Sequence, residues 1–417
     1  MSVADCFDHD PGLVPVAEAR RRLRERVRPV TGIERVPLAM ARGRILAAPL
    51  VAGSDVPAFD NVAVDGWAFA WQPFMADGAF ELPVAEGRSA AGAPHEGHVP
   101  AGHALRVLTG AVLPEGVDTV VLQEEARREE GKIRLPAIRR AGMNRRPRGE
   151  DMRAGEAVLP AGHRLRAQDA GAAALAGHAM LDVFERLRVA VMSTGNEVIE
   201  AGGELPRGGL FDANRPILLN ALSNLPVMTT DLGKLDDDPA RIEATLGRAA
   251  ADHALILTSG GASQGDEDHL ARAIERLGRL RFWRIAIKPG RPLAFGEIGD
   301  ALVVGLPGNP VAASLCFACL VRPLLLALAG GAWIDPRGIP LPFAHALEKR
   351  AGRTELVRVR LVGHEGTTAL ERIARQGSGV LTSLTEADGV AELAHDLTAI
   401  EPGDRVPFLS FAELGLA

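Results

Sequence analysis

Three apolar runs in the second half of the chain each end in a turn that is rich in Gly, Ser, Thr, Pro or Asn. Together with their turns, these runs occupy residues 187–197, 254–268 and 301–314. Each run has the length of a buried strand. In an open parallel sheet such turns emerge at the carboxyl ends of the strands, and ligands bind in the crevice there. The pattern therefore predicts a phosphate-and-metal site, and an enzyme.

The turn at 259–268 combines the two kinds of group that a metal-bound phosphate needs. Its backbone N–H groups can approach an anion closely, because glycine has no Cβ in the way. We expect the cradle to consist of Ser259, Gly260, Gly261, Ser263 and Gly265. Three acids follow, of which Asp268 is the last, and Mg²⁺ is held by one or two carboxylates together with substrate phosphates. The alternative is that these acids only favour the N-terminus of the next helix.

Two further turns carry acidic side chains. Glu197 follows a strand end that consists of Ser193, Thr194 and Gly195. Asp237 lies in an acidic triplet that precedes a helix-starting Pro. Both could be ordinary caps, because Ser, Thr and Asp are common there and Pro is common in the first helical turn. If Glu197, Asp237 and Asp268 converge, however, a metal is the economical explanation, since two carboxylates 4 Å apart repel by about 4 kcal/mol at an effective dielectric constant of 20.

A constrained lysine offers a cation for an anionic ligand. Only four of the 47 basic residues are lysines, yet Lys288 stands in the segment IKPGRP, where a compact ammonium is indicated. The expected ligand-binding residues beside it are Pro289, Gly290 and Arg291. The third turn supplies Pro307, Gly308 and Asn309. That turn could cradle an anion or simply lead tightly into an apolar helix.

Size, charge and cysteine content narrow the classes of protein. The 417 residues are 47% hydrophobic with a net charge of −6, which suggests two to four domains and excludes a broad basic surface for nucleic acid. The N-terminus lacks the apolar stretch of a secretory signal. The apolar residues 311–328 are broken by Arg322 and Pro323, which indicates a buried helix rather than a membrane span. Cys316 and Cys319 lie in an apolar helical pattern, so we interpret them as core residues in a cytoplasmic protein.

The predicted secondary structure changes along the chain. Residues 13–50 predict a helix, a turn and a second helix, and residues 163–180 predict another helix. Between them, short apolar runs spaced by Gly and Pro predict an inserted β-rich module. From 187 to 332 strands alternate with helices, which predicts a mostly parallel sheet covered on both faces. The remaining residues predict a small antiparallel barrel or sandwich.

The motifs together resemble the molybdopterin molybdenumtransferase family, the bacterial MoeA and gephyrin E-domain proteins. The matching stretches follow the family order from about residue 10 to the C-terminus. They are PAFDNVAVDGWA, RVLTGAVLPEG, RPRGEDMRAGE, STGNEVIE, FDANRPIL, DDDPARI, TSGGASQGDED, FWRIAIKPGRP and GLPGNPVAAS. No single stretch decides the matter, but the set is highly specific.

The resemblance implies a multidomain α/β fold with an elongated subunit. The expected first domain is formed by two segments, 1–50 and 148–180, and the inserted β-rich domain spans 51–147. A three-layer α/β molybdopterin-binding domain follows at 181–332, and a C-terminal β-barrel-like domain spans 333–417. The resemblance also implies a homodimer in which the inserted domain of one subunit faces the α/β domain of the other. No nucleic acid or membrane partner is expected.

The implied reaction inserts molybdenum from molybdate into adenylylated molybdopterin and releases AMP. It needs Mg²⁺ beside the diphosphate and cations for the oxyanion. By position in the motifs, the implied catalytic residues are Asp65, Thr109, Glu197, Asp237, Asp268, Arg284 and Lys288. Of these, Glu197, Asp237 and Asp268 are the implied metal ligands. A molybdopterin adenylyltransferase and apo-molybdoenzymes are the implied partners.

The sequence departs from the family pattern at several positions. The residues found in place of the usual ones are Val62, Val64, Trp67, Asn196, Arg284, Arg291 and Ala312. Positive charge is kept at both cationic positions, so the departures bear on the geometry and affinity of the oxyanion site rather than on the reaction class. Molybdate and tungstate, tetrahedral dianions of similar size, both satisfy the pattern.

Two other functions share part of this pattern. A molybdopterin adenylyltransferase would share the TSGG and LPGNP turns, but stand-alone adenylylating proteins resemble only the α/β part. A scaffold that keeps the fold is the second alternative, because gephyrin-type relatives also organise receptors. A scaffold, however, has no need to maintain repelling carboxylates or Lys288.

Overall fold

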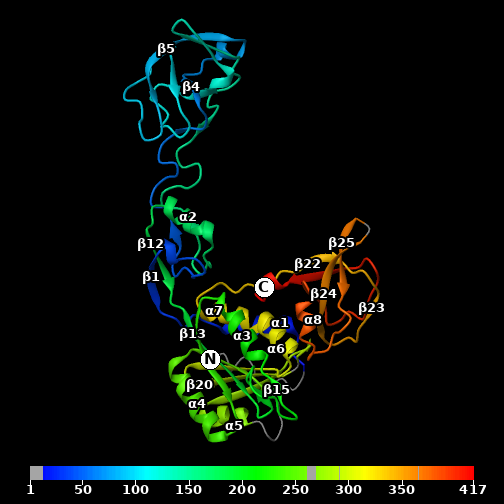
Figure 1. Ribbon diagram of the computed structural model, residues 1–417. Coiled ribbons are helices and arrows are strands. Elements are labelled where there is room, and N and C mark those ends of the chain that lie inside the picture. The colour runs from blue at the N-terminus through cyan, green and yellow to red at the C-terminus, as the bar shows by residue number, and fades with distance from the viewer. Residues whose placement is uncertain (1–12, 261–268, 291, 365) are drawn as a thin grey trace.

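The protein is an elongated, multidomain α/β molecule (Figure 1). The computed structural model describes residues 13–260, 269–290, 292–364 and 366–417. A β-rich module lies at one end, and the α/β part and a C-terminal β part lie together at the other. The expected fold class is confirmed, whereas the residues chosen as domain boundaries stay a prediction.

The central element is a six-stranded sheet with the order β16-β13-β17-β21-β20-β18. The first four strands are parallel: β16 (Val227–Leu235), β13 (Leu187–Thr194), β17 (Leu255–Ser259) and β21 (Ala301–Leu306). The other two are antiparallel additions at one edge: β20 (Pro292–Ile298) and β18 (Arg279–Arg284). The parallel strands therefore end at one side of the sheet, which is where the sequence placed its Gly-rich turns.

Helices cover both faces of this sheet and make three layers. Val189 and Val191 of β13 belong to one core, together with α1 (Val16–Arg26), α3 (Asn214–Ser223), α6 (Pro310–Cys316) and α7 (Arg322–Leu328). Ala190 and Met192 belong to the other core, with α4 (Pro239–Asp252) and α5 (His269–Leu277). Because side chains alternate along a strand, the apolar run 189–192 of β13 fits a strand that is buried on both faces.

The N-terminal segment departs from its prediction in two ways. Helix α1 is present, but Val16, Ala19 and Leu23 pack into the core of the α/β sheet. The second helix, expected up to residue 50, is wrong: only a 3₁₀ turn forms at Leu38–Met40. Gly43 then adopts a φ of +78°, a left-handed conformation that interrupts a helix. Extended chain follows and pairs with residues near 164 and 183.

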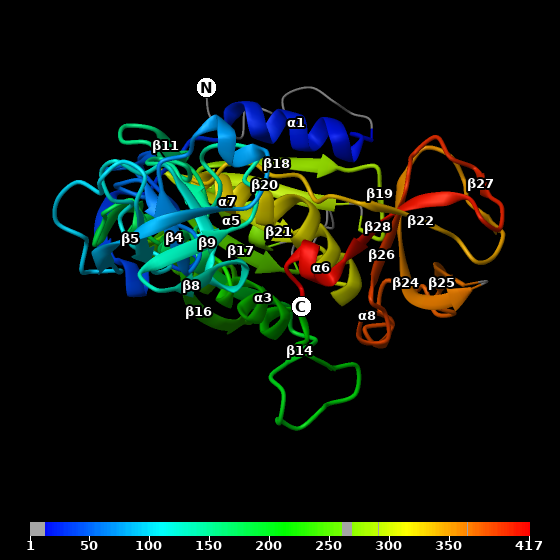
Figure 2. The same ribbon diagram turned by 90° about the horizontal axis from the view of Figure 1, so that it is seen from above.

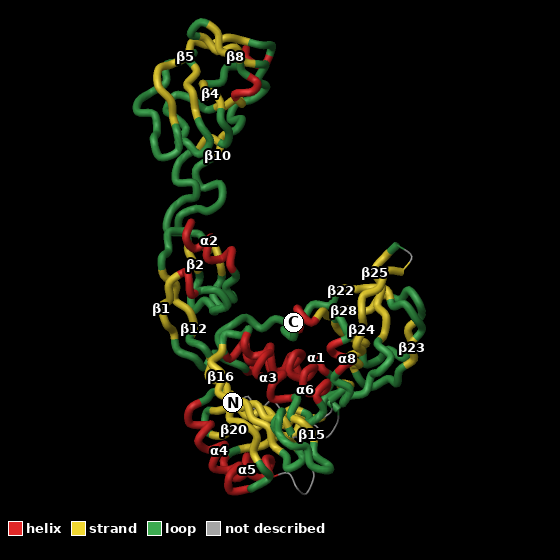
Figure 3. The backbone as a smooth tube through the Cα atoms, viewed as in Figure 1, coloured by secondary structure: helices red, strands yellow, loops and turns green. Residues whose placement is uncertain are grey.

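Two distant segments of the chain form the part next to the α/β sheet. Strand β1 (Ile33–Pro37) pairs with β12 (Met180–Phe184), and β2 (Leu50–Val51) pairs with β11 (Ala157–Leu159). Helix α2 (Ala167–Leu175) contributes to the same small core. Two loop segments lead from here to the β-rich module (Figure 3).

The inserted module is a six-stranded sheet with the order β7-β4-β6-β5-β9-β8. Most of its strands are short, as the Gly and Pro spacing predicts, but β5 has ten residues. They are β4 (Gly66–Phe69), β5 (Phe80–Ser89), β6 (Ala104–Val107), β7 (Thr119–Leu122), β8 (Arg127–Glu129) and β9 (Lys132–Leu135). A further pair, β3 (Asn61–Val62) and β10 (Arg145–Arg146), closes its base. The module has its own apolar core around Phe69 and Ile133.

The C-terminal part is a mostly antiparallel sheet with the order β19-β24-β26-β28-β22. Its members are β22 (Ile339–Pro342), β24 (Thr354–His364), β25 (Thr367–Arg372), β26 (Gly389–Leu393) and β28 (Arg405–Ser410), with β25 paired to β24. The edge strand β19 (Ile287–Lys288) comes from the α/β part of the chain and pairs in parallel with β24. Figure 2 shows this sheet beside the α/β part. The pairing brings the Lys288 segment into both units.

The apolar helix is a core element, as expected. Pro310–Leu328 has the length and hydropathy of a membrane span, but 89% of its most apolar window is buried inside the protein. A π-helical turn, Phe317–Val321, separates α6 from α7. Arg20 of α1 donates from Nε to the carbonyl of Cys319 at 3.1 Å. Burial raises the pKa of the Cys319 thiol to about 11, which agrees with a core role rather than a redox role.

Leu23→Ala tests whether α1 belongs to the α/β core. Leu23 is completely buried, so its truncation should lower the free energy of unfolding by about 2–5 kcal/mol. Urea denaturation followed by circular dichroism measures the change. Arg24→Ala, on the exposed side of the same helix, is the control and should have little effect. Equal effects of the two substitutions would show that α1 does not pack as described.

Candidate functional site

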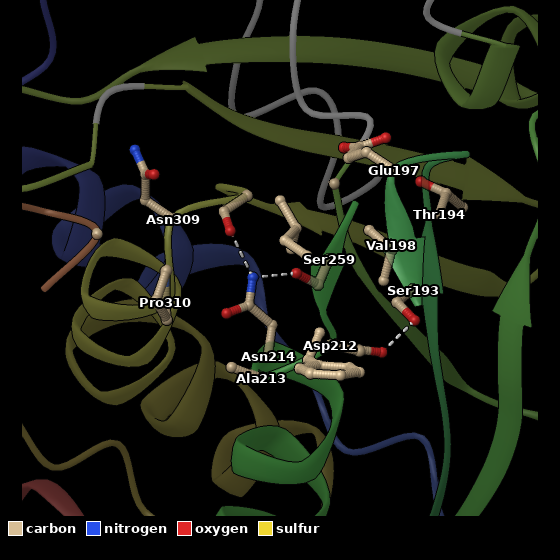
Figure 4. Close-up of a pocket in the computed structure, with 15 residues that line it drawn as sticks. Ser193, Thr194, Glu197, Val198, Asp212, Ala213, Asn214, Ser259, Asn309 and Pro310 are labelled. Carbon is tan, nitrogen blue, oxygen red and sulfur yellow. Dashed lines mark hydrogen bonds between the residues drawn. The ribbon is translucent and has the colours of Figure 1, made fainter. Parts of the chain in front are cut away.

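A cavity of about 570 Å³ opens at the carboxyl ends of β13 and β17 and beside the turn after β21 (Figure 4). It contains residues from each of the three turns that the sequence singled out. Those predicted residues are Ser193, Thr194, Glu197, Ser259, Gly260, Gly308 and Asn309. Gly379, from the C-terminal part of the chain, completes one wall. Segments that are nearly 190 residues apart thus meet at one place.

The turn after β17 approaches β13 so closely that only glycine fits. Gly260 has a φ of +89°, and a Cβ there would lie 2.7 Å from the carbonyl oxygen of Thr194. Any other residue would strain the backbone and push the two strand ends apart. The glycine expected for anion approach is therefore also required for packing. Gly261, Ser263 and Gly265, the rest of the predicted cradle, lie outside the described residues.

Asn214, which the sequence analysis did not select, ties the cavity together. It is the first residue of α3 and is 7% exposed. Its Nδ2 donates to Ser259 Oγ at 2.6 Å and to the carbonyl of Gly308 at 2.7 Å. One amide group thus joins α3, the end of β17 and the turn after β21. In the sequence, Asn214 stands out only as part of the motif FDANRPIL. The likeness of that motif to the family assigns no role to any single residue.

Asp212 is a second buried group that the sequence analysis missed. Its carboxylate accepts a hydrogen bond of 2.5 Å from Ser193 Oγ in the cavity wall. Arg215 donates to it from Nε at 3.2 Å, and also forms ion pairs of 2.6 Å with Glu200 and Asp231. Burial by itself lowers the pKa of Arg215, but these carboxylates outweigh it and the pKa is raised. A charged, fixed network therefore lies behind the Ser193 hydroxyl.

Two of the three expected metal ligands, Glu197 and Asp237, belong to turns that contact each other through Asn196. Asn196 N donates to Asp237 Oδ2 at 3.0 Å, and Asp237 N donates to Asn196 Oδ1 at 3.1 Å. This reciprocal pair fixes the Asp237 turn beside Glu197, whose carboxylate lies against the backbone of Gly195. Asp268 lies outside the described residues. Within the described part of the chain, no group of three or more His, Cys, Asp or Glu side chains is arranged to hold a metal.

Lys288 lines a second cavity, of about 630 Å³, rather than the first. The residues around it are Lys288, Glu348, Lys349, Arg350, Ala351, Arg353 and Glu355. Four of these side chains are basic and two are acidic, so the cavity has a positive formal charge and suits an anion. Pro289 and Gly290 continue the chain from Lys288, and Arg291 lies outside the described residues. Arg284, the last residue of β18, has an exposed side chain, and Pro307 is buried in the turn after β21.

Asp65 directly precedes β4 and Thr109 follows β6, so both belong to the inserted module, which lies at the opposite end of the subunit from the α/β part (Figure 1). Thr109 donates to Asp65 Oδ1 from both its hydroxyl and its backbone N–H, each at 2.7 Å. These two hydrogen bonds stabilise the ionised carboxylate and lower the pKa of Asp65 below its ordinary value. Within one subunit this pair does not reach the cavity residues.

Comparisons with known proteins cover nearly the whole chain. Three family descriptions match: "MoeA N-terminal region (domain I and II)" at 14–177, "Probable molybdopterin binding domain" at 190–327, and "MoeA C-terminal region (domain IV)" at 340–411. A protein of Haemophilus influenzae named molybdopterin molybdenumtransferase is 33% identical over 405 residues, which cover 96% of this chain and 100% of that protein. The chain belongs to the molybdopterin molybdenumtransferase family.

Other members of the molybdopterin molybdenumtransferase family agree in sequence and in fold. The protein of that name from Synechococcus elongatus is 35% identical and is matched over 85% of this chain and 89% of its own. The crystal structure of the molybdopterin biosynthesis MoeA protein from Pyrococcus horikoshii OT3 covers 96% of this chain and 100% of that chain. Its sequence identity is 28% and its TM-score is 0.82. The arrangement of parts described above is thus that of a solved family member.

Asn214→Ala tests the tie across the cavity. The substitution removes the donor to the buried Ser259 Oγ and to the carbonyl of Gly308, so we expect a loss of about 1–3 kcal/mol in the free energy of unfolding. Asn220→Ala, at an exposed position of the same helix, is the matched control. Urea denaturation of the full chain measures both. A loss no larger than that of the control would contradict the role assigned to Asn214.

Thr109→Val tests what lowers the pKa of Asp65. Without the hydroxyl donor, the pKa of Asp65 should rise toward its ordinary range, so the carboxylate takes up its proton at a higher pH than in the native protein. The carboxyl ¹³C shift of selectively labelled Asp65, followed through an acid titration, reports this. Thr109→Ser keeps both donors and should titrate like the native protein. Identical titration of the Val variant would rule out the hydroxyl as a cause.

Proposed function

We propose that this chain inserts molybdenum from molybdate into adenylylated molybdopterin and releases AMP, a step of molybdenum cofactor biosynthesis. The observation that carries the proposal is the meeting of the three Gly-rich turns at one cavity, in a chain that matches a named molybdopterin molybdenumtransferase over 96% of its length. Hydroxyl groups of Thr194 and Ser259 and the backbone at Gly260 are the donors for the diphosphate, and Ser193, whose hydroxyl donates to Asp212, lines the same wall. The cytoplasmic location expected from the sequence stays a prediction.

Magnesium is the cation that suits the acidic residues of this site. Glu197 and Asp237 are hard oxygen donors on adjacent turns, which is the donor set that Mg²⁺ takes from proteins alongside substrate phosphates. Asp268 is the expected third ligand. Bound Mg²⁺ would neutralise the charge of the diphosphate. The chain itself holds the Asp237 turn in place through the reciprocal hydrogen bonds with Asn196.

The second cavity is the proposed site of the molybdate oxyanion. Lys288, Arg350 and Arg353 supply cationic donors there, and Arg284 is expected to contribute to the same function. Oxyanions of this kind are bound best by several charge-assisted donors. The proposal places binding of the oxyanion and binding of the diphosphate on different elements of the same chain.

A homodimer would complete the site. Asp65 and Thr109 match the family's functional positions but belong to the inserted module, which lies at the far end of the subunit from the α/β part. A partner subunit arranged in the opposite direction would bring its own Asp65 and Thr109 to this cavity. A molybdopterin adenylyltransferase that delivers the substrate, and apo-molybdoenzymes that accept the product, are the proposed partners.

Anaerobic incubation of the purified protein with adenylylated molybdopterin, Mg²⁺ and molybdate tests the function. We expect AMP release and product that reconstitutes an apo-molybdoenzyme. Glu197→Gln should lower the rate by about 10²–10³, the size seen when one preorganised polar group is lost from an active site. Glu204→Gln, an equal charge change at an exposed position, is the control.

Two other outcomes would overturn the proposal. Transfer of AMP from MgATP to molybdopterin would identify an adenylyltransferase. Dimerisation without binding of Mg²⁺ or nucleotide would identify a scaffold.

A further inference from the structure

The ammonium of Lys288 is occupied by an internal carboxylate. Its Nζ lies 3.2 Å from Oε2 and 3.3 Å from Oε1 of Glu355, so both oxygens share the one cation. The two residues are register partners in the parallel pairing of β19 with β24. An anion that binds Lys288 therefore has to displace the Glu355 carboxylate from the ammonium, and the fold holds that carboxylate beside it.

We propose that Glu355 is an internal competitor that lowers the affinity of the Lys288 cavity for oxyanions. This inference rests on the proposed function, which assigns the oxyanion to that cavity. The opposite role is that Glu355 positions Lys288 for its ligand. The two roles predict opposite signs for the effect of neutralising Glu355, so one substitution separates them.

Burial shows which partner can move. The side chain of Glu355 is 14% exposed and belongs to the long strand β24, whereas the side chain of Lys288 is 60% exposed. The backbone of the lysine segment is held as well, because Thr354 N donates to the carbonyl of Ala286 at 2.8 Å. On the other side, a Cβ on Gly290 would lie 2.6 Å from Sγ of the buried Cys316. The carboxylate is thus fixed, and the flexible part is the lysine side chain.

The other charged side chains of the cavity do not neutralise the negative charge of Glu355. Arg350 and Arg353 form no ion pair with any described residue, and the Lys349 ammonium donates to the carbonyl of Leu397 at 2.6 Å. These cations attract an anion into the cavity, where it meets the fixed carboxylate. Since like charges repel and Glu355 also holds the ammonium, both effects act against binding.

The size of the effect follows from Coulomb's law. Two unit charges 4 Å apart in a medium as polar as water change a binding constant about fivefold, and more in a less polar cavity. A doubly charged anion such as molybdate is affected more strongly than a singly charged one. Without Glu355 the lysine side chain would be less ordered, which would weaken anion binding. This effect is small, because the lysine side chain is already largely exposed to solvent.

Isothermal titration of the full chain with molybdate tests the inference. Glu355→Gln keeps the shape of the side chain and should tighten molybdate binding by at least about fivefold, with a smaller gain for nitrate. Glu348→Gln removes the same charge from an exposed position of the same cavity and should change the affinity less than about twofold. Weaker binding by Glu355→Gln would overturn the proposal in favour of the positioning role, and unchanged binding would overturn it as well.

A second pair of variants separates this inference from the proposed function. Lys288→Ala should weaken molybdate binding, and in the double variant with Glu355→Gln the gain should shrink, because the two groups act on each other. If Lys288→Ala has no effect, the oxyanion binds elsewhere and the assignment of the cavity fails. If Lys288→Ala weakens binding but Glu355→Gln does not strengthen it, only the competitor role fails. Thermal melting of each variant checks that it is folded.

Discussion

The register of the parallel strands is the constraint on which the site depends. Ser193 pairs with Ser259 across β13 and β17, and Ser259 pairs with Leu306 across β17 and β21. The three strands therefore end at the same level, so the turns that follow them lie at the same edge of the sheet. A slip of one residue would turn every apolar side chain of these strands to the opposite face, so two buried cores fix the position of the hydroxyl groups. The core packing and the site are in this sense one structure.

The sequence predicted those elements whose pattern is local. The alternating strands and helices from β13 to α6 are all present, because long apolar runs with clear turn signals specify them independently of their surroundings. Strand β20 was not predicted, since it starts at Pro292 and contains Gly296, two residues that weaken a strand pattern. The helix expected near residue 45 was wrong, because Gly43 turns the chain and tertiary pairing then holds it extended.

For the site, the sequence indicated the turns but not what joins them. Hydroxyl, glycine, carboxylate and amide residues next to strands could be recognised, and seven of these residues line the first cavity. Asp212 and Asn214 could not be recognised, because their role in the site depends on hydrogen bonds with residues far away in the sequence. Those partners are Ser193, Ser259 and Gly308. In the same way, nothing local shows that the Lys288 segment is an edge strand of the C-terminal sheet. Contacts between units are set by tertiary packing, which no short pattern records.

A buried arginine links the C-terminal sheet to the wall of the first cavity. Arg358 on β24 is 1% exposed, and burial lowers its pKa to about 10. It donates to Gly377 O at 3.2 Å and to Ser383 Oγ at 3.2 Å, so it holds the loop that leads to Gly379 in the wall. In that loop the carbonyl of Ser378 accepts a hydrogen bond of 3.2 Å from Val311 N, at the start of α6. A continuous set of hydrogen bonds therefore joins the C-terminal sheet to the rim of the cavity, so the shape of that rim depends on how the last part of the chain packs.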